Sequence, residues 1–197
     1  FLEAVGNVLG KAALGAQDAF WEPRGAYTGA VSLLQLKRLS VQYVIVGHSE
    51  RRSVFHESVE VVARKTSAVL AAGLTAILCV GETKSDRLSG KAAFVVRRQL
   101  AGVPPDVKHL VVAYEPVWAI GSGEADDPAD TLRMVAVIRS QIAHPAVPIL
   151  YGGSLERRNA EAFLKQRDIG GALVGGASLR SAEFNSILRI AAQYGRQ

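Results

Sequence analysis

Several features that would quickly place a protein are scarce in this chain. Its 197 residues contain one cysteine, Cys79, which excludes an internal disulfide framework and is typical of a reducing compartment. We expect Cys79, at the end of an apolar run, to be a small buried side chain. No uninterrupted apolar run is long enough to cross a bilayer, and residues 1–5 lack the basic and then apolar plan of a signal peptide. The chain is therefore expected to be cytoplasmic, without a membrane partner.

Aromatic residues and strong charge are also scarce. Aromatic side chains make up 7% of the chain and hydrophobic ones 49%, a balance that favours an α/β protein whose strands are buried on both faces. The four histidines lack metal-ligand spacing and no nucleotide-binding glycine motif is present, so we expect no metal and no cofactor. The net charge of +5 comes from scattered basic pairs, which predict solvated helix faces and no nucleic-acid partner: Lys37-Arg38, Arg51-Arg52, Arg97-Arg98 and Arg157-Arg158.

Strand and helix patterns alternate along the whole chain. Helical spacing of apolar residues recurs between the strands, as in residues 59–70, 132–142 and 184–191. This alternation predicts a parallel sheet in one domain over residues 1–197, but periodicity alone does not separate a (β/α) barrel from a doubly wound sheet. The predicted strands are residues 12–16, 43–46, 75–80, 110–114, 147–151 and 171–174.

Residues at the predicted helix ends support these assignments. Asp127 can cap a helix that has Pro128 at its first position, and Ser181 can cap the last helix. Gly73 can close the helix that precedes the strand at residues 75–80.

Two of the predicted strands end in residues that can transfer protons. His48 follows the strand at 43–46, and Glu115 follows the strand at 110–114. Functional residues concentrate at the carboxyl ends of parallel strands. A histidine and a carboxylate there can have pKa values tuned toward neutral pH and act as an acid/base pair. Gly47 lets the backbone turn at the strand end. Residues 49–51 can then start a helical turn whose amino end disfavours a positive imidazole.

Glycines follow the last two predicted strands. Gly152 and Gly153 precede Ser154 after one strand, and Gly175 and Gly176 follow the other. Backbone without side chains lets several N–H groups converge on an oxyanion, so we predict a phosphate site at these two strand ends.

Four stretches of the chain, in this order, resemble the triosephosphate isomerase family. The resemblance covers the chain from about Ala12 to the C-terminus, and residues 25–29 are similar to the dimer-contact loop of that family. The four stretches are Val46–Arg52, Ala113–Gly123, Tyr151–Ser154 and Leu173–Leu179.

The resemblance implies a (β/α)8 TIM barrel with strands 3–8 present in this chain and the first two βα units missing. In that family a strand end with an active-site asparagine and lysine precedes the position of residue 1, and Lys11 precedes its strand and cannot replace that lysine. We therefore expect the 197 residues alone to be aggregation-prone and to have negligible activity. The family usually has an acid after Gly29, where this chain has Ala30, so polar pairing around Arg51 is expected to be weaker.

The resemblance also implies an activity and the roles of site residues. The reaction interconverts dihydroxyacetone phosphate and D-glyceraldehyde 3-phosphate through an enediolate, as in glycolysis and gluconeogenesis, with Glu115 as the base and His48 as a neutral electrophile. Ser49 and Glu50 would belong to the same site, Glu50 as an acid/base or orienting residue. Residues 116–121 resemble the mobile lid of the family. The phosphate of the triose would be held by backbone N–H groups of Gly121, Ser154, Gly175 and Gly176.

A homodimer formed through residues 17–29 is a further implication, with Trp21, Pro23, Tyr27 and Thr28 expected to be exposed. Two other functions stay open at this point. One is a non-catalytic relative that acts as a binding or scaffold protein. The other is a different phosphate-binding barrel isomerase, which would require the matches around His48 and Glu115 to be coincidental.

Overall fold

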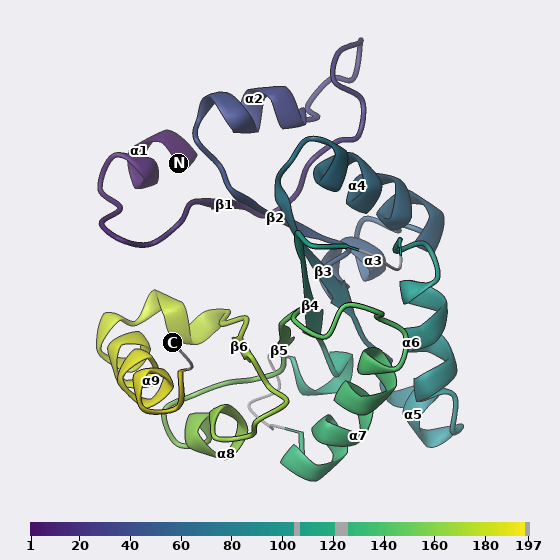
Figure 1. Cartoon of the computed structure of the whole chain (residues 1–197), viewed down its shortest axis with the longest axis vertical. Helices are drawn as coiled ribbons and strands as arrows, with labels where there is room; N and C mark the ends of the chain where they lie inside the picture. The colour runs from purple at the N-terminus through teal and green to yellow at the C-terminus, as the bar shows by residue number, and fades with distance from the viewer. Residues whose placement is uncertain (105–106, 121–125, 196–197) are drawn as a thin grey trace.

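Six parallel strands form a single sheet in the computed structural model, which describes residues 1–104, 107–120 and 126–195. Their order in the sheet is their order in the chain, and the sheet curls into a half-barrel of the kind found in (β/α) barrels (Figure 1). The strands are β1 (Gly15–Ala16), β2 (Tyr43–Val46), β3 (Thr75–Val80), β4 (Leu110–Tyr114), β5 (Ile149–Tyr151) and β6 (Gly171–Ala172).

Helices form an arc around the curled sheet, and the ends of this arc, α1 and α9, carry the chain termini (Figure 1). Among the described residues, no helix has the length and apolar character needed to cross a membrane. The helices are α1 (Leu2–Gly6), α2 (Leu33–Arg38), α3 (Ser49–Ser53), α4 (Val59–Ala71), α5 (Lys84–Leu88), α6 (Ala92–Leu100), α7 (Pro128–Arg139), α8 (Ala160–Leu164) and α9 (Ser181–Tyr194), with two short 3-10 helices, η1 (Val117–Ala119) and η2 (Gly176–Leu179).

The central strands follow the predicted ranges and the outer ones are shorter. Strands β2, β3 and β4 confirm the predictions for residues 43–46, 75–80 and 110–114. The predictions for β1, β5 and β6 were too long, by three residues at the start of β1, two at the start of β5 and two at the end of β6. In this sheet β1 and β6 each pair with one neighbour, so fewer of their residues have a partner backbone, whereas β5 pairs with both β4 and β6.

Pairing between β3 and β4 brings the ends of these strands level. Their register runs from Ala76 opposite Leu110 to Val80 opposite Tyr114, so the residues that follow the two strands emerge at the same edge of the sheet. The interior is aliphatic, as the composition predicts: Val44, Val46 and Val112 are completely buried. Cys79 is 1% exposed, which confirms its prediction as a small buried side chain.

Two of the three predicted helix-end residues are confirmed. The Asp127 side chain accepts a hydrogen bond from the Ala129 N–H at 2.7 Å, with Pro128 as the first residue of α7. Gly73 follows α4 with φ +74°, a conformation that glycine adopts without strain. The prediction for Ser181 was wrong by one position, because Arg180, extended after η2, precedes α9 and Ser181 is already helical.

Candidate active site

His48 and Glu115 meet at the carboxyl edge of the sheet. His48 directly precedes α3, and its Nδ1 accepts a hydrogen bond from the Glu50 N–H at 3.3 Å. Its Nε2 lies 3.2 Å from Oε1 of Glu115, although the two residues are far apart in the sequence. Gly47 makes the turn with φ +68°, as predicted. The structure therefore brings together the two residues that the sequence predicts as an acid/base pair.

Glu115 is a buried carboxylate whose two oxygens differ in their hydrogen bonds. Its side chain is 2% exposed, and Oε2 accepts a hydrogen bond from the Ser49 N–H at 2.8 Å. Oε1 is buried without a hydrogen-bond partner among the described residues. Burial raises the pKa of Glu115, and this effect outweighs the opposing influence of His48 and of the Ser49 N–H. Such a carboxylate has an unused lone pair and an increased proton affinity.

This raised pKa predicts that Glu115 destabilises the fold at neutral pH. The native state binds the proton more tightly than the unfolded chain, so the free energy of unfolding falls as pH rises from the usual carboxyl range through the raised pKa. We expect Glu115→Gln, which cannot ionise, to increase this free energy by about 0.5–2 kcal/mol at pH 7 and by less near pH 4. Urea unfolding at both pH values measures the effect. A glutamine variant that is less stable at pH 7 would contradict this assignment of charge.

A cavity of about 620 Å³ opens in front of this pair. Of the predicted site residues, His48, Glu50, Ser154, Gly175 and Gly176 line it, from the ends of three different strands. Ser49 and Glu115 are buried. The predicted Gly121 lies outside the described residues. The cavity is also lined by the apolar side chains of Ile120 and Leu173 and by charges of both signs, among them Arg180 and Glu156.

Ser154 is engaged with the segment that follows β4. Its hydroxyl and its backbone N–H both donate to the carbonyl oxygen of Ala119, the N–H at 3.2 Å. Glu50 has a side chain that is 73% exposed, and its Oε2 lies 3.9 Å from Nδ1 of His48. Glu50 therefore contacts His48 mainly through its backbone.

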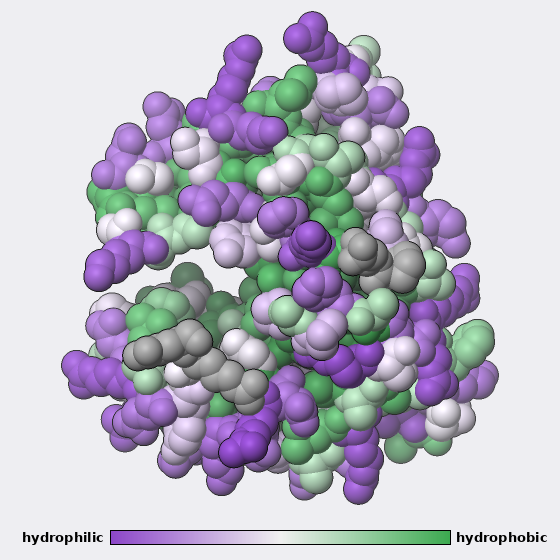
Figure 2. All heavy atoms as spheres, in the orientation of Figure 1, coloured by the Kyte–Doolittle hydropathy of each residue, from purple (hydrophilic) through white to green (hydrophobic). Residues whose placement is uncertain are grey.

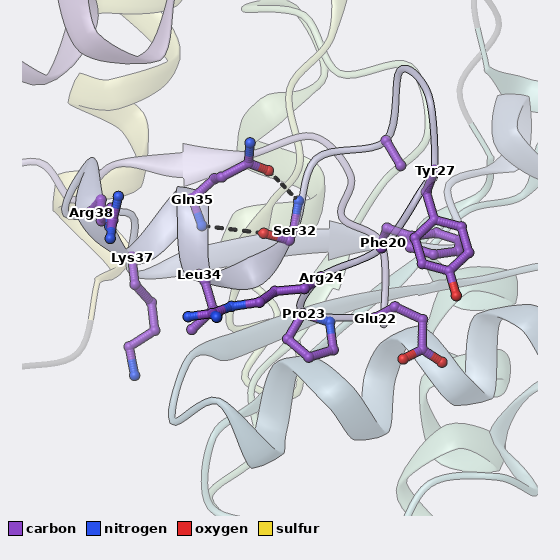
Figure 3. A pocket seen from close by; sticks show the side chains of 12 residues that line it. Phe20, Glu22, Pro23, Arg24, Tyr27, Ser32, Leu34, Gln35, Lys37 and Arg38 are labelled. Carbon is purple, nitrogen blue, oxygen red and sulfur yellow. Dashed lines mark hydrogen bonds between the residues drawn. The ribbon is translucent and has the colours of Figure 1, made fainter.

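A larger hollow of about 770 Å³ lies elsewhere, between residues 20–27 and helix α2 (Figure 3). Figure 3 shows the two hydrogen bonds between Ser32 and Gln35 that cap α2 beside it. The hollow has basic side chains, Arg24, Lys37 and Arg38, but no paired histidine and carboxylate. It therefore lacks the groups that proton transfer requires.

Glu82 is a second buried carboxylate that our sequence interpretation missed. It is completely buried and accepts hydrogen bonds from the Tyr114 hydroxyl at 3.1 Å and from Trp118 Nε1 at 3.2 Å. Burial and the nearby Glu82 charge raise the pKa of Tyr114. The signal was available, because Glu82 follows the apolar strand β3 with one residue, Gly81, between them. Its bond to Trp118 ties the segment after β4 to the end of β3.

The prediction of solvated basic pairs was wrong for Arg51 and Arg52. Arg51 forms ion pairs with Asp18 at 3.0 Å and with Glu57 at 2.6 Å, and both arginines are partly buried. Lys65, 4% exposed, contacts the same two carboxylates. Ala30 has no carboxylate, and Arg51 pairs with Asp18 and Glu57. Within the described residues, no group of three or more histidine, cysteine or acidic side chains is arranged to hold a metal ion.

A curled parallel sheet with a histidine and a buried carboxylate at its carboxyl edge is the arrangement of an α/β barrel enzyme. The model of the family described as "Triosephosphate isomerase" matches residues 1–191, so the similarity begins at residue 1 rather than near Ala12. The chain belongs to the triosephosphate isomerase family.

Individual relatives agree with this assignment. A triosephosphate isomerase of Roseiflexus sp. (strain RS-1) is 49% identical over 188 residues, which cover 89% of this chain and 74% of the relative. That of Paracidovorax citrulli (strain AAC00-1) is 47% identical over 197 residues, covering 95% and 78%. That of Trichormus variabilis is 47% identical over 177 residues, covering 89% and 73%.

Proposed function

We propose that this protein interconverts dihydroxyacetone phosphate and D-glyceraldehyde 3-phosphate, a step of glycolysis and gluconeogenesis. The observation that carries the proposal is the buried, unpartnered Oε1 of Glu115, 3.2 Å from Nε2 of His48 beside a cavity at the sheet edge. The names of the relatives support the same reaction. The substrate is a small phosphorylated triose, and the protein acts in the cytoplasm, where a free thiol such as Cys79 stays reduced.

Glu115 acts as the base in this proposal. Its carboxylate takes a proton from one carbon of the triose and returns it to the adjacent carbon, with an enediolate between the two steps. The Ser49 N–H holds Oε2, which leaves Oε1 for the proton. The apolar side chains of Ile120 and Leu173 in the cavity wall reduce access of water to the intermediate.

His48 polarises the substrate oxygens. Because Nδ1 accepts the Glu50 N–H, the neutral ring carries its proton on Nε2, the atom that faces Glu115. Nε2–H can then donate to the carbonyl oxygen of the substrate before the proton transfer and to that of the product after it. Glu50 orients the ring through its backbone N–H.

The phosphate binds to backbone N–H groups of Ser154, Gly175 and Gly176 in this proposal, together with that of Gly121, which is outside the described residues. Glycine leaves the backbone at positions 175 and 176 accessible from the cavity. The Ser154 N–H must exchange its bond to the Ala119 carbonyl for the phosphate. Arg180 in the cavity lining adds a positive charge that attracts the dianion.

The decisive experiment is an isomerase assay of the protein expressed from its complete coding sequence. Glyceraldehyde 3-phosphate in D₂O should give dihydroxyacetone phosphate with deuterium at the carbon that received the proton. Glu115→Gln should lower the rates of turnover and of isotope incorporation together, by about 10²- to 10⁴-fold. Saturable binding of the triose phosphate without turnover would contradict the proposal and indicate a binding or scaffold protein.

The proposed fold is an eight-stranded barrel in which β1–β6 are the third to eighth strands. Each outer strand of the sheet pairs on one side only, and Figure 2 shows hydrophobic side chains inside the notch on the side of the chain termini. Two further strands from outside these residues would pair with β1 and β6 and cover this surface.

The proposed assembly is a homodimer through residues 17–29. Pro23, Tyr27 and Thr28 are exposed, as expected, whereas Trp21 is half-buried under the guanidinium of Arg64, 4.8 Å from its ring. We expect Thr28→Arg to raise the dimer dissociation constant at least about tenfold, because a charge would be buried at the contact. Sedimentation of this variant beside Ser67→Arg, an exposed position on α4, measures the effect. Equal dissociation constants for the two variants would argue against this contact.

A further inference from the structure

Arg52 has two backbone carbonyls as partners. Its Nε donates to the Gly47 carbonyl at 2.7 Å, and its Nη2 donates to the Cys79 carbonyl at 3.0 Å. Among the described residues, no carboxylate lies within ion-pair distance of this guanidinium. Burial lowers the pKa of Arg52, while the negative charges of Glu115 and Glu57 nearby oppose this effect. Two neutral carbonyls therefore hold the partly buried guanidinium of Arg52 in position, and its positive charge is balanced at longer range by Glu115 and Glu57.

The backbone at Gly47 leaves room for this side chain. A Cβ at position 47 would lie 2.7 Å from Nη2 of Arg52 and 2.6 Å from Cγ1 of Val62. The left-handed conformation of Gly47 also turns its carbonyl back toward α3. Gly47 thus permits both the backbone turn before His48 and the position of the Arg52 side chain.

Helix α3 links Arg52 to the acid/base pair. It has five residues, too few to be stable without tertiary contacts. Its first N–H, from Ser49, donates to Oε2 of Glu115, and His48 precedes it. Its other end is tied by Arg52 to the end of β2 and to the end of β3, the strand between those of His48 and Glu115. Figure 1 shows α3 beside β3.

We infer that Arg52 is a positioning residue: by joining α3 to the ends of β2 and β3, it holds His48 and the Ser49 N–H against Glu115. The expected change in kcat rests on the proposed function. The positioning of His48 and of the Ser49 N–H rests on the geometry alone. Its positive charge also favours the ionised form of the Glu115 carboxylate.

The test compares Arg52→Met and Arg52→Lys with Arg97→Met, a control at an exposed position on α6. The titration of Glu115 is followed by ¹³C NMR of its carboxyl carbon, and kcat and KM are measured in parallel. The other titratable groups that face Glu115 are His48 and Cys79, and the Gly152 backbone packs against it without a titratable side chain. All three variants keep these groups.

We expect Arg52→Met to raise the pKa of Glu115 and to lower kcat about 100-fold with KM nearly unchanged, since a displacement of about 1 Å at a reacting group has this cost. Arg52→Lys should recover part of kcat, because lysine keeps the charge but has no fork that reaches two carbonyls. If Arg52→Met does not fold, Arg52→Lys decides by the same two measurements. A Glu115 titration and kcat that match the Arg97→Met control would overturn the inference. If the wild-type protein has no turnover, the proposed function fails, whereas the NMR titration still decides the role of Arg52.

Discussion

Replacing Glu115 with glutamine lowers kcat by about 10²- to 10⁴-fold and leaves KM nearly unchanged, in the protein expressed from its complete coding sequence. The reason is that Oε1 accepts the proton only in the transition state and contributes little to ground-state binding. Glu115→Asp should also lower kcat, because one methylene less withdraws the carboxylate from Nε2 of His48. Initial rates with both trioses measure these effects.

The control for this prediction is Glu60→Gln, an exposed glutamate at the start of α4. It should keep wild-type kinetics. The wild-type rate should also fall at acidic pH, because the base acts when ionised and burial has raised its pKa. A loss confined to KM, or an acidic limb that persists in Glu115→Gln, would exclude Glu115 as the base.

Removing the charge of Lys65 should be among the most destabilising single changes outside the apolar core. Its Nζ lies 2.6 Å from Oδ1 of Asp18 and 2.6 Å from Oε1 of Glu57, and the lysine is 4% exposed. Asp18 is 25% exposed and can be hydrated, whereas Glu57 is 7% exposed and its Oε2 already lacks a hydrogen-bond partner among the described residues. We expect Lys65→Met to lower the free energy of unfolding by about 3–5 kcal/mol, a large share of the 5–15 kcal/mol typical of a domain.

Urea unfolding tests this prediction against Lys84→Met, an exposed lysine at the start of α5. The control should change the free energy of unfolding by less than about 0.5 kcal/mol. Adding Glu57→Gln to Lys65→Met should restore part of the stability, because it removes a buried carboxylate that has lost one of its two cationic partners and keeps only Arg51. A Lys65→Met variant as stable as Lys84→Met would show that the charges of Lys65, Asp18 and Glu57 are effectively solvated.

The barrel-like arrangement shows where local patterns reach their limit. Hydrophobic runs predicted six strands and the helices between them, because burial on both faces demands continuous apolar sequence. The same runs could not separate a barrel from a doubly wound sheet. The structure shows strands β1 to β6 in sequential order, without the reversal that a doubly wound sheet has, and the sheet curls. Strand order depends on pairing between distant segments, which periodicity does not encode.

By itself, the sequence determined the central strands and the positions of His48 and Glu115, because a polar residue at the end of a buried parallel strand must emerge at the sheet edge. It also predicted the Asp127 cap and the turn at Gly47, which depend on neighbouring residues only. Only the tertiary structure decided the roles of Arg52 and Lys65. Arg52 bonds to a carbonyl 27 positions away, and Lys65 pairs with a carboxylate 47 positions away. A basic residue in a polar stretch has the same local sequence pattern whether its side chain is solvated or paired with a distant residue. Only the tertiary structure distinguishes these two cases.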